Sequence, residues 1–302
     1  MSNIFKAYDI RGKYPNELDE KKAELIGRSI ADFFIKKTRK KNHIILVGKD
    51  VRNVSGVLER ALIKGLVKQG ADVLRAGLCT TPYFYFLINK LRPDGGVMVT
   101  ASHNPREYGG FKIRGKRNEA ISEDSGLKDI KKSVLSKKFK KTSSTGKIKI
   151  CRSFKEDYLK ALCRGIKINK SINVIIDNGE GSTALFLPEL LGKFSKLKYK
   201  PLFFKIDGLF KQHSPNPLLA ESQRFAKEEL RKGGFDFGII FDGDGDRVIF
   251  LDERGGMVKT EFILGLYAEK QMKDGINPHT KTSENLILRK AHRSFGVGVK
   301  TS

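Results

Sequence analysis

The 302-residue sequence lacks any apolar run long enough to cross a bilayer. Its longer apolar runs, such as residues 83–88, fall far short of the ~20 residues that a membrane-spanning helix needs. The N-terminus lacks an apolar stretch behind a basic start, which argues against a secretory signal. Cysteines number three, and Cys79, Cys151 and Cys163 form no CxxC pair, a pattern typical of reduced thiols. We therefore expect a cytoplasmic protein with no membrane partner.

Acidic residues are also scarce: 34 Asp and Glu stand against 59 Lys and Arg, which gives a formal net charge of +25. Such an excess is typical of nucleic-acid-binding proteins, but also of proteins that handle phosphorylated substrates or come from a lysine-rich proteome. The densest basic segment, residues 128–149, has Phe139 as its one aromatic residue. Because a surface that stacks bases needs aromatic side chains at intervals, we favour the second interpretation and expect that nucleic acid is not a partner.

Apolar periodicity predicts helices that alternate with short strands in the first part of the chain. The expected helices span residues 19–37, 55–69 and 83–91, and the expected strands span residues 43–50, 71–77 and 95–102. This order is typical of a parallel sheet with helical crossovers.

Residues 131–149 are polar, basic and rich in Ser and Thr, which predicts a linker or an exposed segment. The alternation then starts again, so we expect two α/β domains of similar build. The expected helices of this part span 154–163, 183–191, 222–232 and 261–273, and the expected strands lie within 171–182, 200–208 and 235–255. The chain ends in a strand-like segment at 294–302. A strand as the last element of an unfinished unit indicates a truncated chain, and an edge strand at a natural terminus is the alternative.

The acidic loop "DGDGDR" places Asp242, Asp244 and Asp246 at alternate positions, separated by Gly243 and Gly245. In a tight turn that the glycines permit, the three carboxylates can converge on one point. Three like charges at that distance are costly unless a cation lies among them. Oxygen-only ligands favour a hard ion, Mg²⁺ or Ca²⁺.

An EF-hand calcium loop is one alternative for this segment. Counted from Asp242, the acidic positions match, and Glu253 stands at position 12. However, Arg247 occupies position 6, where the loop needs Gly, and the flanking segments are β-like rather than helical. A hairpin turn without an ion is the second alternative. Magnesium fits better, since it takes part of its ligands from phosphates, and Arg247 would then donate to the same phosphate.

The segment "VMVTASHNPREYGGFK", residues 97–112, ends an apolar strand with Ser102 beside His103. No G-x-S-x-G elbow surrounds the serine, which argues against an α/β-hydrolase. A turn stabilised by Ser and Asn ahead of a proline is an equally good interpretation of the segment alone. Together with a Mg²⁺ site, an arginine and a lysine, however, the serine completes a set of groups typical of phosphoryl transfer.

Five segments, in order along residues 8–247, resemble motifs of the α-D-phosphohexomutases, the phosphomannomutase/phosphoglucomutase family. "TASHNPREYGGFK" is similar to the phosphoserine loop of that family, and "DGDGDR" is similar to its magnesium loop. "YDIRG", "GKDVRNVS" and "HSPNPL" resemble its N-terminal signature, its Gly-x-Asp-x-Arg turn and its Pro-Asn-Pro turn. A nucleic-acid-binding protein on an enzyme-derived scaffold is the alternative function.

The resemblance implies tandem mixed-sheet α/β domains of the phosphohexomutase type. Domain I with the phosphoserine loop would span residues 1–140, domain II with the metal loop 146–250, and an incomplete domain III 251–302, with the fourth domain absent. The family's sugar-reading loop and its loop for the non-reacting phosphate belong to the third and fourth domains, and neither is found here. We therefore expect weak activity or none from the chain alone, and a second polypeptide could supply the missing domains.

The resemblance also implies a function and a set of site residues. A phosphoryl group on Ser102 would pass to a hexose phosphate, so that 1- and 6-phosphates of mannose or glucose interconvert through a hexose 1,6-bisphosphate, which also serves as activator. Mg²⁺ would be held by a phosphate oxygen on Ser102 and by the three aspartates of the acidic loop.

The remaining site residues follow from the same resemblance. Lys112 and Arg11 would act as acid/base groups or stabilise charge, and His103 would support the serine loop. Arg247 and Asn104 would bind substrate phosphate. We expect nearby cations to lower the pKa of Lys112. The family usually has Asn where this chain has Gly109, and we expect the lost amide contact to loosen the loop.

Overall fold

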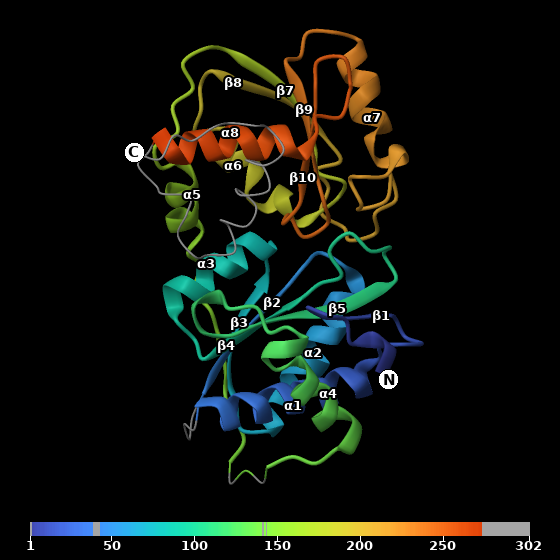
Figure 1. Cartoon of the computed structure of the whole chain (residues 1–302), viewed down its shortest axis with the longest axis vertical. Helices are drawn as coiled ribbons and strands as arrows, with labels where there is room; N and C mark the ends of the chain where they lie inside the picture. The colour runs from blue at the N-terminus through green and yellow to red at the C-terminus, as the bar shows by residue number, and fades with distance from the viewer. Residues whose placement is uncertain (1, 39–42, 141, 143, 274–302) are drawn as a thin grey trace, which may run out of the picture.

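The structure of the chain is a computed structural model that describes residues 2–38, 43–140, 142 and 144–273. It consists of two α/β units, each built on its own sheet, and the two sheets lie one above the other in Figure 1. Within the described residues, no helix has the length and apolar character that a membrane span requires.

The first unit contains a six-stranded sheet in the order β1-β5-β4-β2-β3-β6. The central strands β2, β3 and β4 are parallel, β6 adds a parallel edge, and β5 pairs antiparallel with both β4 and β1. The expected mixed sheet is therefore confirmed. The strands are β1 (Ile10–Lys13), β2 (Ile44–Lys49), β3 (Asp72–Leu78), β4 (Gly95–Val99), β5 (Tyr108–Arg114) and β6 (Ile148–Ile150).

Helices cover both faces of this sheet because successive strand residues point to opposite faces. Ile45 and Val47 of β2 belong to the core beneath α1, α2 and α4, whereas Leu46 between them packs in the core beneath α3 and α5 (Lys155–Cys163). The helices are α1 (Glu20–Thr38), α2 (Asn53–Lys68), α3 (Thr81–Leu91) and α4 (Leu127–Ser136), with short 3₁₀ turns at η1 (Ser2–Ile4), η2 (Lys116–Asn118) and η3 (Glu123–Ser125).

The expected linker at residues 131–149 is partly wrong. Residues 131–136 continue α4, which buries Leu127, Ile130 and Val134 against the first core. Three apolar residues at helical spacing outweigh the lysines between them, since the lysines lie on the exposed face. The end of the segment forms the edge strand β6 rather than an irregular linker.

The second unit has a four-stranded sheet in the order β10-β9-β7-β8, with β7 parallel to β8 and β9 and an antiparallel β9–β10 hairpin. Its strands are β7 (Ile172–Asp177), β8 (Leu197–Leu202), β9 (Phe237–Phe241) and β10 (Val248–Leu251). The helices along this part of the chain are α5 (Lys155–Cys163), which packs on the first sheet, η4 (Ser182–Leu185), α6 (Leu187–Leu191), α7 (Ala220–Arg231) and α8 (Thr260–Lys273).

Two expectations for this unit need correction. The helix expected at 183–191 is a 3₁₀ turn followed by the short helix α6, with a proline in the first turn of α6. The strand expected at 200–208 ends at Leu202, because Phe203 has a positive φ of 54° that no strand accommodates. The strand-like segment at 294–302 lies outside the described residues.

The loop of residues 203–219, between β8 and α7, is fastened to the sheet by His213. Its Nε2 lies 3.0 Å from Asp177 Oδ1, and its Nδ1 donates to the Ser214 carbonyl at 2.7 Å. Burial alone would lower the pKa of His213, but the hydrogen bond and charge of Asp177 outweigh it and raise that pKa. The protonated imidazole satisfies both acceptors.

Helices α1 and α2 pack with direct backbone contact at two glycines. A Cβ added to Gly65 would lie 2.0 Å from the Glu24 carbonyl oxygen, and one added to Gly27 would lie 2.2 Å from the Leu62 oxygen. We predict that Gly65→Ala lowers the free energy of unfolding by about 2 kcal/mol, although alanine normally stabilises a helix by about 1 kcal/mol. Gly56→Ala on the same helix is the control, since its nearest contact would be 3.8 Å away. The measurement is urea unfolding of both variants. Equal changes in the free energy of unfolding would contradict the packing argument.

The His213–Asp177 pair predicts a pH-dependent stability. The folded pKa of His213 is raised above its unfolded value of about 6.5, so its contribution to stability is complete below that pH. The contribution is lost as the pH rises through the folded pKa. The difference in unfolding free energy between wild type and His213→Gln is therefore expected to be larger near pH ~6 than near pH ~8.5. A difference that stays constant over this range would contradict a charged His213 in the folded protein.

Candidate active site

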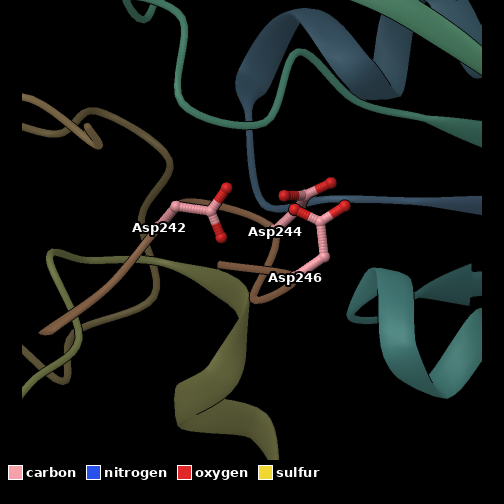
Figure 2. Close-up of side chains that lie close together, drawn as sticks. All are labelled: Asp242, Asp244 and Asp246. Carbon is pink, nitrogen blue, oxygen red and sulfur yellow. The ribbon is translucent and has the colours of Figure 1, made fainter. Parts of the chain in front are cut away.

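Two loops from the two sheets meet at one point between the units. The first follows β4 and contains Ser102, and the second joins β9 to β10 and contains the aspartates shown in Figure 2. The hydroxyl of Ser102 donates a hydrogen bond to Asp242 Oδ2 at 2.8 Å, and both residues are buried. The serine loop and the acidic loop, which the sequence predicts to act together, are therefore in direct contact.

Ser102 has a left-handed backbone conformation, with φ of 52°. A residue with a Cβ adopts this conformation only where its surroundings impose it. The Ser102 N–H donates to Thr100 Oγ1 at 2.8 Å, and the Asn104 N–H donates to the Ala101 carbonyl at 3.0 Å. The tight turn is therefore fixed on both sides of the serine.

The carboxylate oxygens of Asp242, Asp244 and Asp246 lie within 4.8 Å of one another. The side chains of Asp242 and Asp244 are fully buried, and that of Asp246 is 24% exposed. Asp242 Oδ1 accepts from the backbone N–H of Gly245 at 3.0 Å and of Arg247 at 3.1 Å. The hairpin backbone therefore aims this carboxylate toward the serine loop.

Asp244 is held from the first unit. Its Oδ2 accepts from Thr81 Oγ1 at 2.6 Å and from Lys112 Nζ at 2.8 Å, and Thr100 Oγ1 lies 3.2 Å from it. Its Oδ1 is buried with no hydrogen-bond partner among the described residues. A buried carboxylate oxygen without a partner, in a set of oxygen-only donors, fits a hard divalent cation. The EF-hand alternative is wrong, since strands β9 and β10 flank the loop.

The cluster perturbs the acidity of its own members. Burial and then the charges of the other two aspartates raise the pKa of Asp242. Burial and then the charge of Asp244 raise the pKa of Asp246. Burial would also raise the pKa of Asp244, but the charge and hydrogen bond of Lys112 outweigh it and lower that pKa. Lys112 therefore favours the charged form of Asp244.

Lys112 extends from β5 into this cluster and forms ion pairs with Asp244 and Asp246. Burial would lower the pKa of Lys112, but the two carboxylates outweigh it and raise that pKa. The expectation of a lowered pKa is therefore wrong for this arrangement, because the nearest charges to the ammonium group are negative. Lys112 is a fixed positive charge here.

His103 and Arg11 lie beside the serine without bonding strongly to its hydroxyl. His103 Nδ1 is 3.5 Å from Ser102 Oγ, a long separation for a hydrogen bond. Burial, followed by the charges of Arg247 and Arg11, lowers the pKa of His103 to about 4. Its imidazole is thus neutral at neutral pH. Arg11, on β1, donates to the Ala101 carbonyl and pairs with Asp9 at 2.8 Å.

Arg247 and Asn104, two further candidate site residues, form hydrogen bonds within the site through their backbones. Arg247 donates its N–H to Asp242, while its side chain is exposed at the mouth of the hairpin. Asn104 offers its carbonyl oxygen to Arg52 at 2.6 Å and is half-buried. Both therefore stand within the two converging loops, as the sequence leads us to expect.

The glycine that replaces the usual asparagine lies in β5, opposite Gly12 of β1. A Cβ on Gly109 would lie 2.2 Å from Cδ1 of Leu58, which occupies the space that a side chain would need. The strand pairing on both sides of Gly109 is intact. Leu58 thus fills the space beside Gly109, and the expected loosening of the loop stays a prediction.

Four residues that contact the two loops were not assigned roles from the sequence. Thr81 donates to Asp244 and Thr100 lies beside it, and Asp50 and Arg52, which follow β2, contact the serine loop. The segment "GKDVRNVS" already marked Asp50 and Arg52, but a threonine that binds across two units leaves no pattern in the sequence.

Family models match most of the chain. The model described as "Phosphoglucomutase/phosphomannomutase, alpha/beta/alpha domain I" matches residues 2–141, and that of "alpha/beta/alpha domain II" matches residues 156–256.

Curated relatives show the same family. A phosphomannomutase of Escherichia coli is 36% identical over 276 residues, which cover 89% of this chain and 60% of the relative. A protein of Xanthomonas campestris named "Phosphohexose mutases" is 35% identical over 270 residues, 88% of this chain and 58% of the relative. The chain thus spans about three fifths of the length of these relatives.

A solved structure agrees with the fold. A phosphoglucomutase/phosphomannomutase family protein from Burkholderia thailandensis superimposes with a TM-score of 0.83 at 26% identity, over 96% of this chain and 65% of that one. The paired loops, the two matched domain models and this similarity together place the chain in the α-D-phosphohexomutase superfamily.

Proposed function

We propose that this chain acts in the interconversion of hexose 1-phosphate and hexose 6-phosphate, with mannose phosphates, glucose phosphates or both as substrates. The observation that carries the proposal is the 2.8 Å hydrogen bond from Ser102 Oγ to Asp242 Oδ2, which joins a buried serine of one unit to the acidic cluster of the other. Its relatives named phosphomannomutase support the choice of substrate.

The proposal assigns domain I to residues 1–140, domain II to 146–250 and part of a third domain to 251–302. It also includes a second polypeptide that supplies the sugar-reading loops. A cytoplasmic location belongs to the same proposal, since Cys79, Cys151 and Cys163 are all unpaired, as in a reducing compartment.

Asp242, Asp244, Asp246 and a phosphate oxygen on Ser102 would hold Mg²⁺. The fit rests on the oxygen-only donor set and on the unpartnered Oδ1 of Asp244. When bound, Mg²⁺ would offset negative charge on the transferring phosphoryl group.

The reaction begins with a phosphoryl group on Ser102 Oγ and a hexose monophosphate beside it. The Oγ–P bond breaks, a bond forms from phosphorus to the sugar hydroxyl oxygen, and the hydroxyl proton is finally taken up by Ser102 Oγ. The product is hexose 1,6-bisphosphate, the proposed intermediate and activator. After it turns around, its other phosphoryl group returns to Ser102 by the reverse step, which leaves the isomeric monophosphate.

The side chains around the serine have separate proposed roles. Lys112 is positively charged and stabilises charge on the moving phosphoryl group, and Arg11 adds a second positive charge while it holds the Ala101 carbonyl. His103 is neutral and packs beside the serine as a support for the loop. Arg247 is exposed at the mouth of the site and, with Asn104, is assigned to substrate phosphate.

The alternative of a nucleic-acid-binding protein gains no support from the comparisons, which match mutases along the first 256 residues. The excess of positive charge is explained equally well by anionic sugar phosphates.

Transfer to the serine can be tested as a half reaction. Incubation of the chain with Mg²⁺ and glucose 1,6-bisphosphate is expected to add one phosphoryl group, about 80 Da, to a peptide that contains Ser102. Ser102→Ala is expected to remain unmodified, while Ser136→Ala, at an exposed serine on α4, is modified like wild type. Intact-mass and peptide mass spectrometry provide the measurement. No gain of mass in wild type, or the same gain in Ser102→Ala, would argue against the proposal.

Metal binding can be tested without activity. A Mg²⁺ concentration about 100 times its Kd is expected to raise the melting temperature by roughly 5 °C. Asp246→Asn is expected to reduce this rise strongly, and because the Asp246 side chain is partly exposed and Asn has nearly the same shape, the variant should fold. Asp129→Asn makes the same charge change at an exposed position on α4 and should leave the rise intact. Equal rises in the two variants would remove the acidic loop as the metal site.

A further inference from the structure

The motif "GKDVRNVS" contains a buried arginine that the proposed reaction leaves without a role. The side chain of Arg52 is completely buried. Its Nη2 donates to the carbonyl oxygens of Ser102 and Asn104, both at 2.6 Å, and its Nη1 donates to the Pro105 carbonyl at 2.7 Å. One guanidinium group thus holds three carbonyls of the turn that presents the serine.

The charge of Arg52 is balanced by Asp50, whose Oδ2 lies 3.2 Å from Nε. Asp50 also accepts hydrogen bonds from Ser55 Oγ at 2.5 Å and from Thr100 Oγ1 at 2.7 Å. Thr100 Oγ1 in turn accepts the N–H of Ser102. The network therefore holds both peptide groups of Ser102: Arg52 donates to its carbonyl oxygen, and Thr100 accepts from its N–H.

The second unit covers this arginine. The ring centre of Phe210 lies 4.9 Å from Arg52 Cζ, at cation–π distance. Gly208, two residues earlier, has a positive φ of 67° and packs so closely that a Cβ would lie 2.0 Å from the Val51 carbonyl oxygen. The loop between β8 and α7 thus closes over the guanidinium and excludes water from it.

We propose that Arg52 is the positioning residue that keeps Ser102 in its left-handed conformation and its hydroxyl directed at Asp242, with Phe210 as the cover supplied by the second unit. A planar guanidinium presents donors in a fixed fork, so one side chain can serve three carbonyls, whereas the ammonium of a lysine is a single rotating point charge. The inference rests on the proposed function, since it gives the held serine its purpose.

A purely structural role for Arg52 predicts a different outcome. A buried ion pair that only stabilises the first unit would, on removal, loosen strands β2 and β4 together with the loop. A positioning role predicts a change confined to the serine loop. Local hydrogen exchange therefore distinguishes the two, independently of any phosphoryl transfer.

The test compares Arg52→Lys with wild type and with Arg75→Lys. Arg75 is a matched control because it makes a two-point contact with Glu59, at 2.7 and 2.9 Å, on the same sheet but away from the serine loop. Two quantities are measured for each chain: hydrogen exchange at the amides of residues 101–108 and at β2 and β4, and the rate of phosphoryl transfer to Ser102 from glucose 1,6-bisphosphate. For Arg52→Lys we expect faster exchange in the loop alone and a transfer rate lower by roughly 100-fold. Arg75→Lys should match wild type in both.

Wild-type exchange in the loop of a folded Arg52→Lys chain would overturn the inference, and so would faster exchange spread equally over β2 and β4. If no chain accepts a phosphoryl group, the proposed function fails, and loop exchange still decides whether Arg52 holds the turn.

If Arg52→Lys does not fold, Phe210→Leu serves as the second variant, since it leaves every hydrogen bond of Arg52 in place. Its control is Phe225→Leu, which alters a ring contact with Phe203 in the same unit. Exchange of the loop should be faster in Phe210→Leu than in Phe225→Leu. Equal exchange in both would overturn the inference.

Discussion

The arrangement depends on how three carboxylates are tolerated within 4.8 Å of one another. The second unit supplies all three carboxylates, whereas the positively charged side chain that contacts Asp244 comes from outside this unit. That cation, Lys112, comes from β5 of the first unit. Thr81 of the first unit also donates to Asp244, and Thr100 Oγ1 lies 3.2 Å from the same carboxylate. The charge cluster of one unit is thus stabilised by donors of the other, so docking of the units and assembly of the site are the same event.

The same contact region explains why the serine is fixed so firmly. A left-handed conformation at a residue with a Cβ is retained where the surroundings over-determine it, and such residues cluster at functional sites. Here the Ser102 N–H, carbonyl and hydroxyl each have a partner, in Thr100, Arg52 and Asp242. Because phosphoryl transfer is mostly a matter of positioning and charge, a pre-set serine opposite a compensated acidic cluster is what the proposed function would require.

Much of this could be predicted from the sequence, and what escaped has a physical reason. Long periodic segments such as α1 and α2 and the spacing of the acidic loop have local signals, and the structure confirms the helices. The edge strand β1 is short and its neighbour β5 is glycine-rich, and both are stabilised by pairing, which leaves little periodicity. The raised pKa of Lys112 depends on carboxylates 132 and 134 residues away. No local pattern encodes that separation.

The two glycines of "DGDGDR" have different roles, which the sequence alone did not distinguish. The alternate spacing of the aspartates predicted that their carboxylates converge, and both glycines were expected to permit a tight turn. In the structure they differ. Gly243 permits close approach, since a Cβ there would lie 2.9 Å from the Ser102 carbonyl oxygen, whereas Gly245 has a positive φ of 76° that turns the hairpin. Gly243 is thus a contact residue of the serine loop, and a side chain at this position would push apart the two loops whose meeting defines the site.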